Sequence, residues 1–329
     1  NTTGTEDVAM GVEALDTNTT GSYNVAIGME AMDANTTASN NTAVGHKVLF
    51  ANTTGQNNVA MGFEALDANT TANSNTAIGS ASMSANTTGT QNAAVGRSAL
   101  ASSTTASNNT TVGYESMTSN TTGADSVAVG ANALDAQTTG GSNVAIGQGS
   151  MTSQTTGEFN VAVGRASLAT STTGVGNVAV GDAALNSTAG NNNTGVGYAA
   201  LYANTTGATN VAVGREALEA NTTASDNVAV GYIALTANTT GAGNVAVGRG
   251  ALQANTTGQH LTALGYGALA SNTTGVDNVA VGLNALGTVT TSSYNIAVGK
   301  NALLAVNTGD GRNVAIGQGA MTSATTGAY

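Results

Sequence analysis

Hydrophobic and polar residues recur along this chain with a period of 17 residues. The clearest marker is a glycine preceded by β-branched, small and apolar residues, as in Asn210–Gly214, which reads NVAVG. Nineteen such glycines run from Gly11 to Gly317, and every step is 17 residues except one of 16 and one of 18. A fixed period of this length predicts a stacked-repeat architecture, in which each unit buries its apolar face against its neighbours.

The residues before each glycine are predicted to form a short strand, because Val-Ala-Val is β-branched and short. Side chains alternate between two faces along a strand, so the flanking valines share one face and the alanine takes the other. We assign the valine before the glycine to the core, together with the leucine or methionine four residues after it. The representative core residues are Val213, Leu218, Val230 and Leu235.

The rest of the unit reads as a second short segment and a loop. Residues 216–220 favour helix as much as strand but are too short for a stable helix, so we interpret them as a short strand, with a single helical turn as the alternative. Asn-Thr-Thr-Gly has turn chemistry, and both changes of repeat length fall there. The sequence therefore predicts an all-β parallel β-solenoid or β-roll of 19 repeats of about 17 residues, continuous over residues 1–329. Neither end carries a polar cap, so we expect the interior of a longer fibre.

An asparagine precedes Val-Ala-Val in most repeats, with Ser126 and Leu261 among the exceptions. Stacked amides in register satisfy one another's donors and acceptors. We therefore predict a side-chain amide ladder at this column.

The amino-acid composition and charge exclude some fold classes and some kinds of partner. The chain has 44 glycines and no proline or cysteine, but no Gly-X-Y triplet, which excludes collagen. A net charge of −11 without a basic cluster argues against nucleic acid as a partner. No apolar run approaches the roughly 18 residues of a spanning helix, so we expect no membrane insertion by this segment.

The NVAVG and NVAIG motifs resemble the SVAIG-type head repeats of trimeric autotransporter adhesins. The longer form at Gly197–Gly207, GYAALYANTTG, is similar to repeats of phage tail fibres and bacterial surface fibres. This resemblance implies a left-handed β-roll, a homotrimer within a long fibre, and an extracellular location on a cell surface or virion.

The alanine between the valines is also held small, whereas the positions after the glycine accept charged residues. We interpret this column as a subunit interface, represented by Ala212, Ala229 and Ala246. In the alternative interpretation, the alanine packs against the Leu/Met column of its own chain.

The recurring Thr-Thr pair is the most conspicuous chemical feature. It is expected to bond the turn backbone and neighbouring threonines, or, alternatively, to carry covalent glycans. Asn-Thr-Thr is an N-glycosylation sequon, but the asparagine is lost more often than the threonines, which favours O-linkage. The candidate glycosylated residues are Thr19, Thr20, Thr36, Thr37, Thr53, Thr54, Thr70, Thr71, Thr205, Thr206, Thr239 and Thr240.

We expect no catalytic, cofactor or metal site. There is no thiol, the two histidines lie in different repeats, and the acidic residues are too sparse for calcium loops. The sequence favours the structural shaft or head of an extracellular fibre, such as an adhesin, filament or phage tail fibre, with a host surface or glycan as a candidate partner. The alternative is a soluble binding solenoid that presents its Thr-rich face to glycan or ice.

Overall fold

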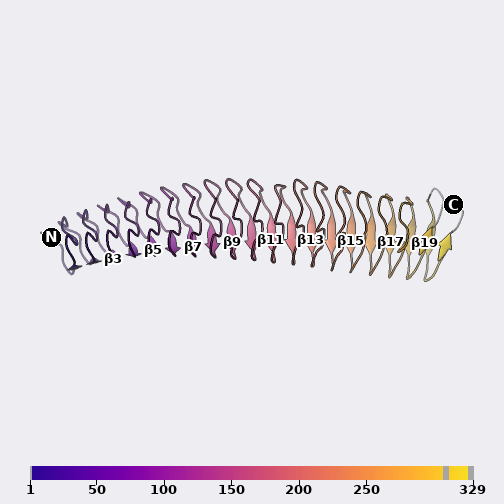
Figure 1. The fold of residues 1–329 in the computed structure, drawn as a ribbon, viewed down its shortest axis with the longest axis horizontal. Coiled ribbons are helices and arrows are strands. Elements are labelled where there is room, and N and C mark those ends of the chain that lie inside the picture. Colours follow the sequence, from indigo (N-terminus) through magenta and orange to yellow (C-terminus); the bar gives the residue numbers. More distant parts are fainter. Residues whose placement is uncertain (1, 307–310, 325–329) are drawn as a thin grey trace. The chain divides into compact units, whose positions relative to one another are not determined.

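The computed structural model describes residues 2–306 and 311–324, and these contain strands and turns but no helix (Figure 1). The chain divides into two units, Asn1–Arg165 and Ala166–Tyr329. The strands of the first unit are β1 (Val8–Met10), β2 (Val25–Ile27), β3 (Thr42–Val44), β4 (Val59–Met61), β5 (Thr76–Ile78), β6 (Ala93–Val95), β7 (Thr110–Val112), β8 (Val127–Val129), β9 (Val144–Ile146) and β10 (Val161–Val163).

The strands of the second unit are β11 (Val178–Val180), β12 (Thr194–Val196), β13 (Val211–Val213), β14 (Val228–Val230), β15 (Val245–Val247), β16 (Thr262–Leu264), β17 (Val279–Val281), β18 (Ile296–Val298), β19 (Ala305–Val306), β20 (Val314–Ile316) and β21 (Ser323–Ala324). Within each unit, neighbouring repeats pair their three-residue strands in parallel, with Ala43 opposite Ala60 and Ala212 opposite Ala229. β19 pairs with β21 in a separate two-stranded sheet. The prediction of an all-β parallel solenoid is confirmed.

The glycine that ends each strand is required by its backbone and by its neighbours. Gly214 has φ of 135°, a conformation that L side chains rarely adopt. A Cβ placed on Gly214 would lie 2.5 Å from the carbonyl oxygen of Gly231 in the next turn. The stacking distance between turns therefore leaves no room for any other residue at this corner.

The segment after the glycine is neither the short strand nor the helical turn that the sequence suggested. Glu216 and Leu218 both have left-handed backbone, with φ of 57° and 51°. As a result the Glu216 N–H donates to Tyr198 O in the preceding turn (2.9 Å), and the Leu218 N–H donates to Ala234 O in the following turn (3.0 Å). Left-handed geometry costs about 1–2 kcal/mol for a residue with a Cβ. Burial of the leucine side chain, worth roughly 1.5–3 kcal/mol, offsets it.

Each strand turns toward the interior the face that the sequence analysis predicted to point outward. Ala212, Ala229 and Ala246 are completely buried within their own chain, so their assignment to a subunit interface is wrong. Val213 is 37% exposed and Val230 is only partly buried, so their assignment to the core is also wrong.

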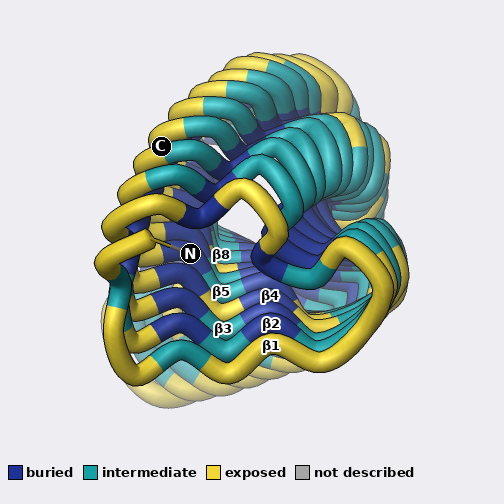
Figure 2. The backbone as a smooth tube through the Cα atoms, turned by 90° about the vertical axis from the view of Figure 1, so that its left-hand side faces the viewer, coloured by how far each residue is buried: buried dark blue, intermediate teal, exposed yellow. Residues whose placement is uncertain are grey.

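The leucine column does fill the core, because Leu218 and Leu235 are fully buried as predicted. The backbone positions that line the inside of the coil are buried, as Figure 2 shows around β2–β5. In most turns the interior holds one large aliphatic side chain and only a methyl group opposite, and Thr111 in β7 is the largest residue at that inward position. At Gly195, which replaces the usual alanine, a Cβ would lie only 3.1 Å from Leu185 Cγ. The alanine is therefore small because it packs against the Leu/Met column of its own chain.

This packing predicts a difference between two neighbouring substitutions to leucine. Ala229→Leu adds volume to a closed interior and should destabilise the fold by about 1–3 kcal/mol. Val230→Leu, on the opposite face of β14, should leave the stability nearly unchanged. Thermal unfolding followed by circular dichroism measures both, and equal melting temperatures would contradict the inward orientation of Ala229.

Candidate functional surfaces

The predicted asparagine ladder is present and buried. Asn210 Nδ2 donates to Asn193 Oδ1 (3.1 Å), and the backbone N–H of Asn210 donates to the same oxygen (3.0 Å). Each side chain thus accepts from the turn that follows it. The ladder joins neighbouring turns inside the polar half of the core, where no water is needed to satisfy the amides.

A second asparagine ladder was missed from the sequence. The asparagine of the Asn-Thr-Thr loop is also buried, and Asn238 Nδ2 donates to Asn221 Oδ1 (3.0 Å). Asn238 and Asn227 both donate to the carbonyl oxygen of Gly241, at 2.9 and 3.0 Å. This shared acceptor joins the two ladders within one turn. The substitutions in this column gave a sign of it, since most are amides or hydroxyls, such as Gln137 and Ser103, although Val289 also occurs there.

Burial of this column contradicts N-glycosylation of the folded chain. Asn18, Asn52 and Asn238 are no more than 2% exposed. Their Nδ2 atoms already donate to the carbonyl three residues later, as in the 2.9 Å bond from Asn18 to Gly21. The sequon asparagines are therefore structural.

The two threonines of each pair differ in their surroundings. The hydroxyl of the first donates to the backbone carbonyl of the threonine one turn later, over 2.7 Å from Thr19 to Thr36 and 2.9 Å from Thr205 to Thr222. The same bond, at 3.0–3.3 Å, is made by Thr36, Thr53, Thr70 and Thr239. The expected bonding to turn backbone is thus confirmed for these hydroxyls.

The second threonine is exposed, and in the pairs predicted to carry glycans its hydroxyl makes no hydrogen bond to the described part of the chain, whereas Thr3 donates to Thr19 O (3.4 Å). Its representatives are Thr20, Thr37, Thr54, Thr71, Thr206 and Thr240. Of each pair, this residue is the one whose hydroxyl is open to a covalent glycan. Because only one hydroxyl per pair is available, the pair does not present a uniform threonine array.

The outer residues of the strands that precede the repeat glycines form two uncharged, mainly apolar columns on the surface of each unit, with threonine at five positions, Thr42, Thr76, Thr110, Thr194 and Thr262. In β13 they are Val211 and Val213, on either side of the buried Ala212. Away from the first and last strands, the most exposed members have 36–48% of their surface open to solvent. They are Val59, Met61, Ile78, Val95, Val112 and Ile146 in the first unit, and Val180, Val213, Val245, Leu264 and Ile296 in the second. We call these two columns the strand face.

The position directly after the glycine forms a different surface. In five successive turns it holds Tyr198, Arg215, Tyr232, Arg249 and Tyr266. Each guanidinium carbon lies 5.4–5.8 Å from the centres of the tyrosine rings on both sides, within cation–π range. We call this series the Arg-Tyr ladder.

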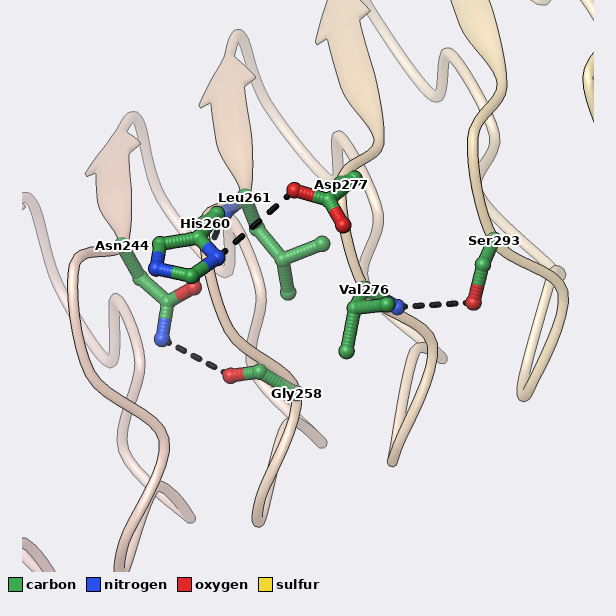
Figure 3. Close-up of polar contacts among 7 residues, drawn as sticks. All are labelled: Asn244, Gly258, His260, Leu261, Val276, Asp277 and Ser293. Atoms are coloured by element: carbon green, nitrogen blue, oxygen red, sulfur yellow. Dashed lines mark hydrogen bonds and ion pairs between the residues drawn. The ribbon is translucent and has the colours of Figure 1, made fainter.

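Leu261 shows what happens where an asparagine is missing from the first ladder (Figure 3). Its N–H still donates to Asn244 Oδ1 (3.0 Å), and the Asn244 amide still donates to Gly258 O (2.9 Å). The leucine side chain offers no acceptor to the N–H of Asn278, which makes no hydrogen bond within the described residues. The column therefore tolerates one apolar substitution without losing register.

Among the residues that the structure describes, the titratable side chains are distributed over many separate turns. His260 Nδ1 lies 3.6 Å from Asp277 Oδ1 on the surface (Figure 3), and His46 stacks on Phe63 with ring centres 5.4 Å apart. Burial raises the pKa of the Asp67 carboxyl, and Glu64 raises it further. In the described ranges, no group of three or more His, Cys, Asp and Glu side chains is placed to hold a metal ion.

A scan against models of known protein families and a search of curated proteins found no match to this chain. Within residues 2–306 and 311–324, no helix has the length and apolarity to cross a membrane.

The amide ladders predict a stability cost for a single buried change. Asn227→Leu removes the acceptor for the Asn244 N–H (2.9 Å) and leaves that donor buried without a partner, which should cost about 1–3 kcal/mol. Leu261→Asn is the matched control, because it adds an acceptor where the ladder lacks one and should not destabilise the fold. Urea unfolding midpoints measure both changes, and an unchanged midpoint for Asn227→Leu would contradict the structural role of the ladder.

Proposed function

We propose that this chain forms the shaft of an extracellular fibre, in which identical chains associate through the strand face. The observation that supports the proposal is the solvent exposure of two mainly apolar columns, which the described residues leave partly uncovered. Monomeric soluble proteins rarely expose contiguous apolar patches larger than a few hundred Å². A surface of this kind is typical of an interaction site.

The residue choice on the strand face supports contact with a partner. None of the outward positions in the nineteen strands preceding the repeat glycines holds a charged residue. The position after the glycine is equally accessible but accepts Arg97, Asp182 and Lys300. If water covered both surfaces, both would accept charge. The difference favours a strand face that is covered in the assembled protein.

Association of identical chains with closed rotational symmetry would cover this face all along a shaft. An axis parallel to the stack brings each turn against the same turn of its neighbours, so each outward residue meets its own copy, which is valine in most layers. The column is two side chains wide, which suits the meeting of several chains at a central axis. The resemblance to trimeric adhesin heads supports three chains, and it also supports a location on a cell surface or virion.

The rival function, a Thr-rich face for ice or glycan, has less support. The first threonine of each pair uses its hydroxyl to bond the neighbouring turn, as Thr239 does with Thr256 O (3.0 Å). This hydroxyl is therefore already committed within the chain. O-linked glycans on the second threonine remain compatible with the fibre, because that column lies outside the strand face.

The association can be tested by placing charge on the strand face. The variant Val211→Glu/Val213→Glu should remain folded by circular dichroism, because both side chains point outward, and should dissociate to the 31.8 kDa chain. The control is Leu283→Glu, which adds charge at an exposed apolar residue (38% exposed) outside the strand face. Light scattering coupled to size exclusion measures the mass of all three proteins.

We expect the native protein and the control to have about three times the chain mass. A dimeric native protein would contradict the assembly of three chains but would still agree with association through the strand face. A native monomer, or a double variant of native mass, would contradict association through the strand face.

A further inference from the structure

A small notch opens on the second unit beside the Arg-Tyr ladder. Its volume is about 220 Å³. Its floor contains Gly250 and Gly267, which occupy the second position after the repeat glycine in two successive turns. The neighbouring turns place Ile233 and Asn284 at this position, and both line the notch. The notch therefore exists because two side chains are missing in succession.

The notch also differs from the rest of the ladder in charge. Arg215 is neutralised within its own turn, since its Nη2 lies 2.9 Å from Glu216 Oε1. Arg249 is followed by Gly250 where Arg215 is followed by Glu216. Among the described residues, no carboxylate oxygen lies within 4.0 Å of the Arg249 guanidinium. The same substitution that opens the notch leaves this cation unpaired, and no acidic residue lines the cavity.

Two side-chain amides complete the lining. Asn284 Oδ1 lies 2.5 Å from where a Cβ on Gly267 would be, and Gln253 Oε1 lies 3.4 Å from the corresponding point on Gly250. Neither amide makes a hydrogen bond within the described part of the chain. Each offers both donors and an acceptor. The Tyr266 ring, 54% exposed, adds an apolar surface and a hydroxyl.

We propose that this notch binds a carboxylated pyranose, the acidic sugar residue of a surface glycan. The guanidinium of Arg249 would pair with the sugar carboxylate, for which its planar fork is suited. Gln253 and Asn284 would exchange hydrogen bonds with the ring hydroxyls, and Tyr266 would pack against the C–H surface. The volume lies below the range for drug-sized ligands, which fits a single sugar residue. This site goes beyond the fibre proposal and does not depend on it.

The test uses matched acidic and neutral probes, sialyllactose against lactose, and oligogalacturonate against its carboxyl-reduced form. Titration calorimetry should show binding of the acidic member of a pair and not of the neutral one. Arg249→Gln should weaken binding by roughly tenfold or more, because a hydrogen bond to a charged group is lost. Arg215→Gln is its control and should bind like the native protein.

Filling the notch gives an independent variant. Gly250→Glu places a carboxylate beside Arg249, as in the Arg215–Glu216 turn, and should abolish binding. The fold accepts glutamate there, because Glu216 has φ of 57° at the equivalent position and Gly250 has φ of 65°. Gly149→Glu is the control in the first unit, with φ of 62° at the same repeat position and no arginine before it.

Light scattering on the same samples should give the native mass for every variant, which separates this test from that of fibre assembly. Absence of binding to all acidic probes, equal binding of acidic and neutral probes, or unchanged binding by Gly250→Glu would overturn the proposal. Binding of a polyglutamate peptide in preference to the acidic sugars would show a site for protein carboxylates, and would overturn it too.

Discussion

Buried asparagine amides are the interaction on which the rest of this solenoid depends. In the first ladder the amide oxygens accept from the following turn, as Asn193 Oδ1 does from the Asn210 N–H, and the amide nitrogens donate to a carbonyl in the loop, as Asn227 Nδ2 does to Gly241 O. A slip by one residue would bury all these groups without partners, at about 1–3 kcal/mol each. The ladders therefore fix the same register as the parallel strands. Backbone bonds outside the strands, such as that from the Leu218 N–H to Ala234 O (3.0 Å), hold it as well.

The two irregular repeats show how strictly this register is kept. Across the 16-residue step the Asn193 N–H still donates to Asn177 Oδ1 (3.0 Å), and across the 18-residue step the Asn313 N–H still donates to Asn295 Oδ1 (3.2 Å). The gained or lost residue is absorbed before the asparagine is reached. The buried amide column continues on both sides of each change of length.

Because the interior is narrow and uniform, chemical variety among the turns is found at the outward repeat positions. Inside, each turn repeats nearly the same small residues, one large aliphatic side chain and amides, so it offers little variety. Outside, a given repeat position keeps its backbone conformation whatever side chain it holds, as Glu216, Ile233 and Gly250 show at one such position. One surface position can therefore hold a charged residue in one turn, an apolar residue in the next and a glycine in the third, without a change of backbone conformation. The surfaces proposed for association and for ligand binding lie on separate columns of repeat positions.

Much of this protein followed from the sequence alone. The period, the parallel strands, the first amide ladder, the burial of Leu218 and the loop position of Thr-Thr all follow from local residue chemistry and a fixed spacing. The second ladder was hidden because Asn-Thr-Thr also has the composition of an exposed turn and of a sequon.

The direction of the strand was decided only by the tertiary structure. Alternation along Val211–Val213 divides the side chains between two faces, but both faces are apolar, so the pattern does not say which is inside. That choice depends on how much space the coil encloses. Once Leu218 occupies it from across the turn, only the methyl group of Ala212 fits opposite, and the valines must face outward. The notch at Arg249 also required the structure, because it depends on the stacking of Gly250 on Gly267, which lie 17 residues apart.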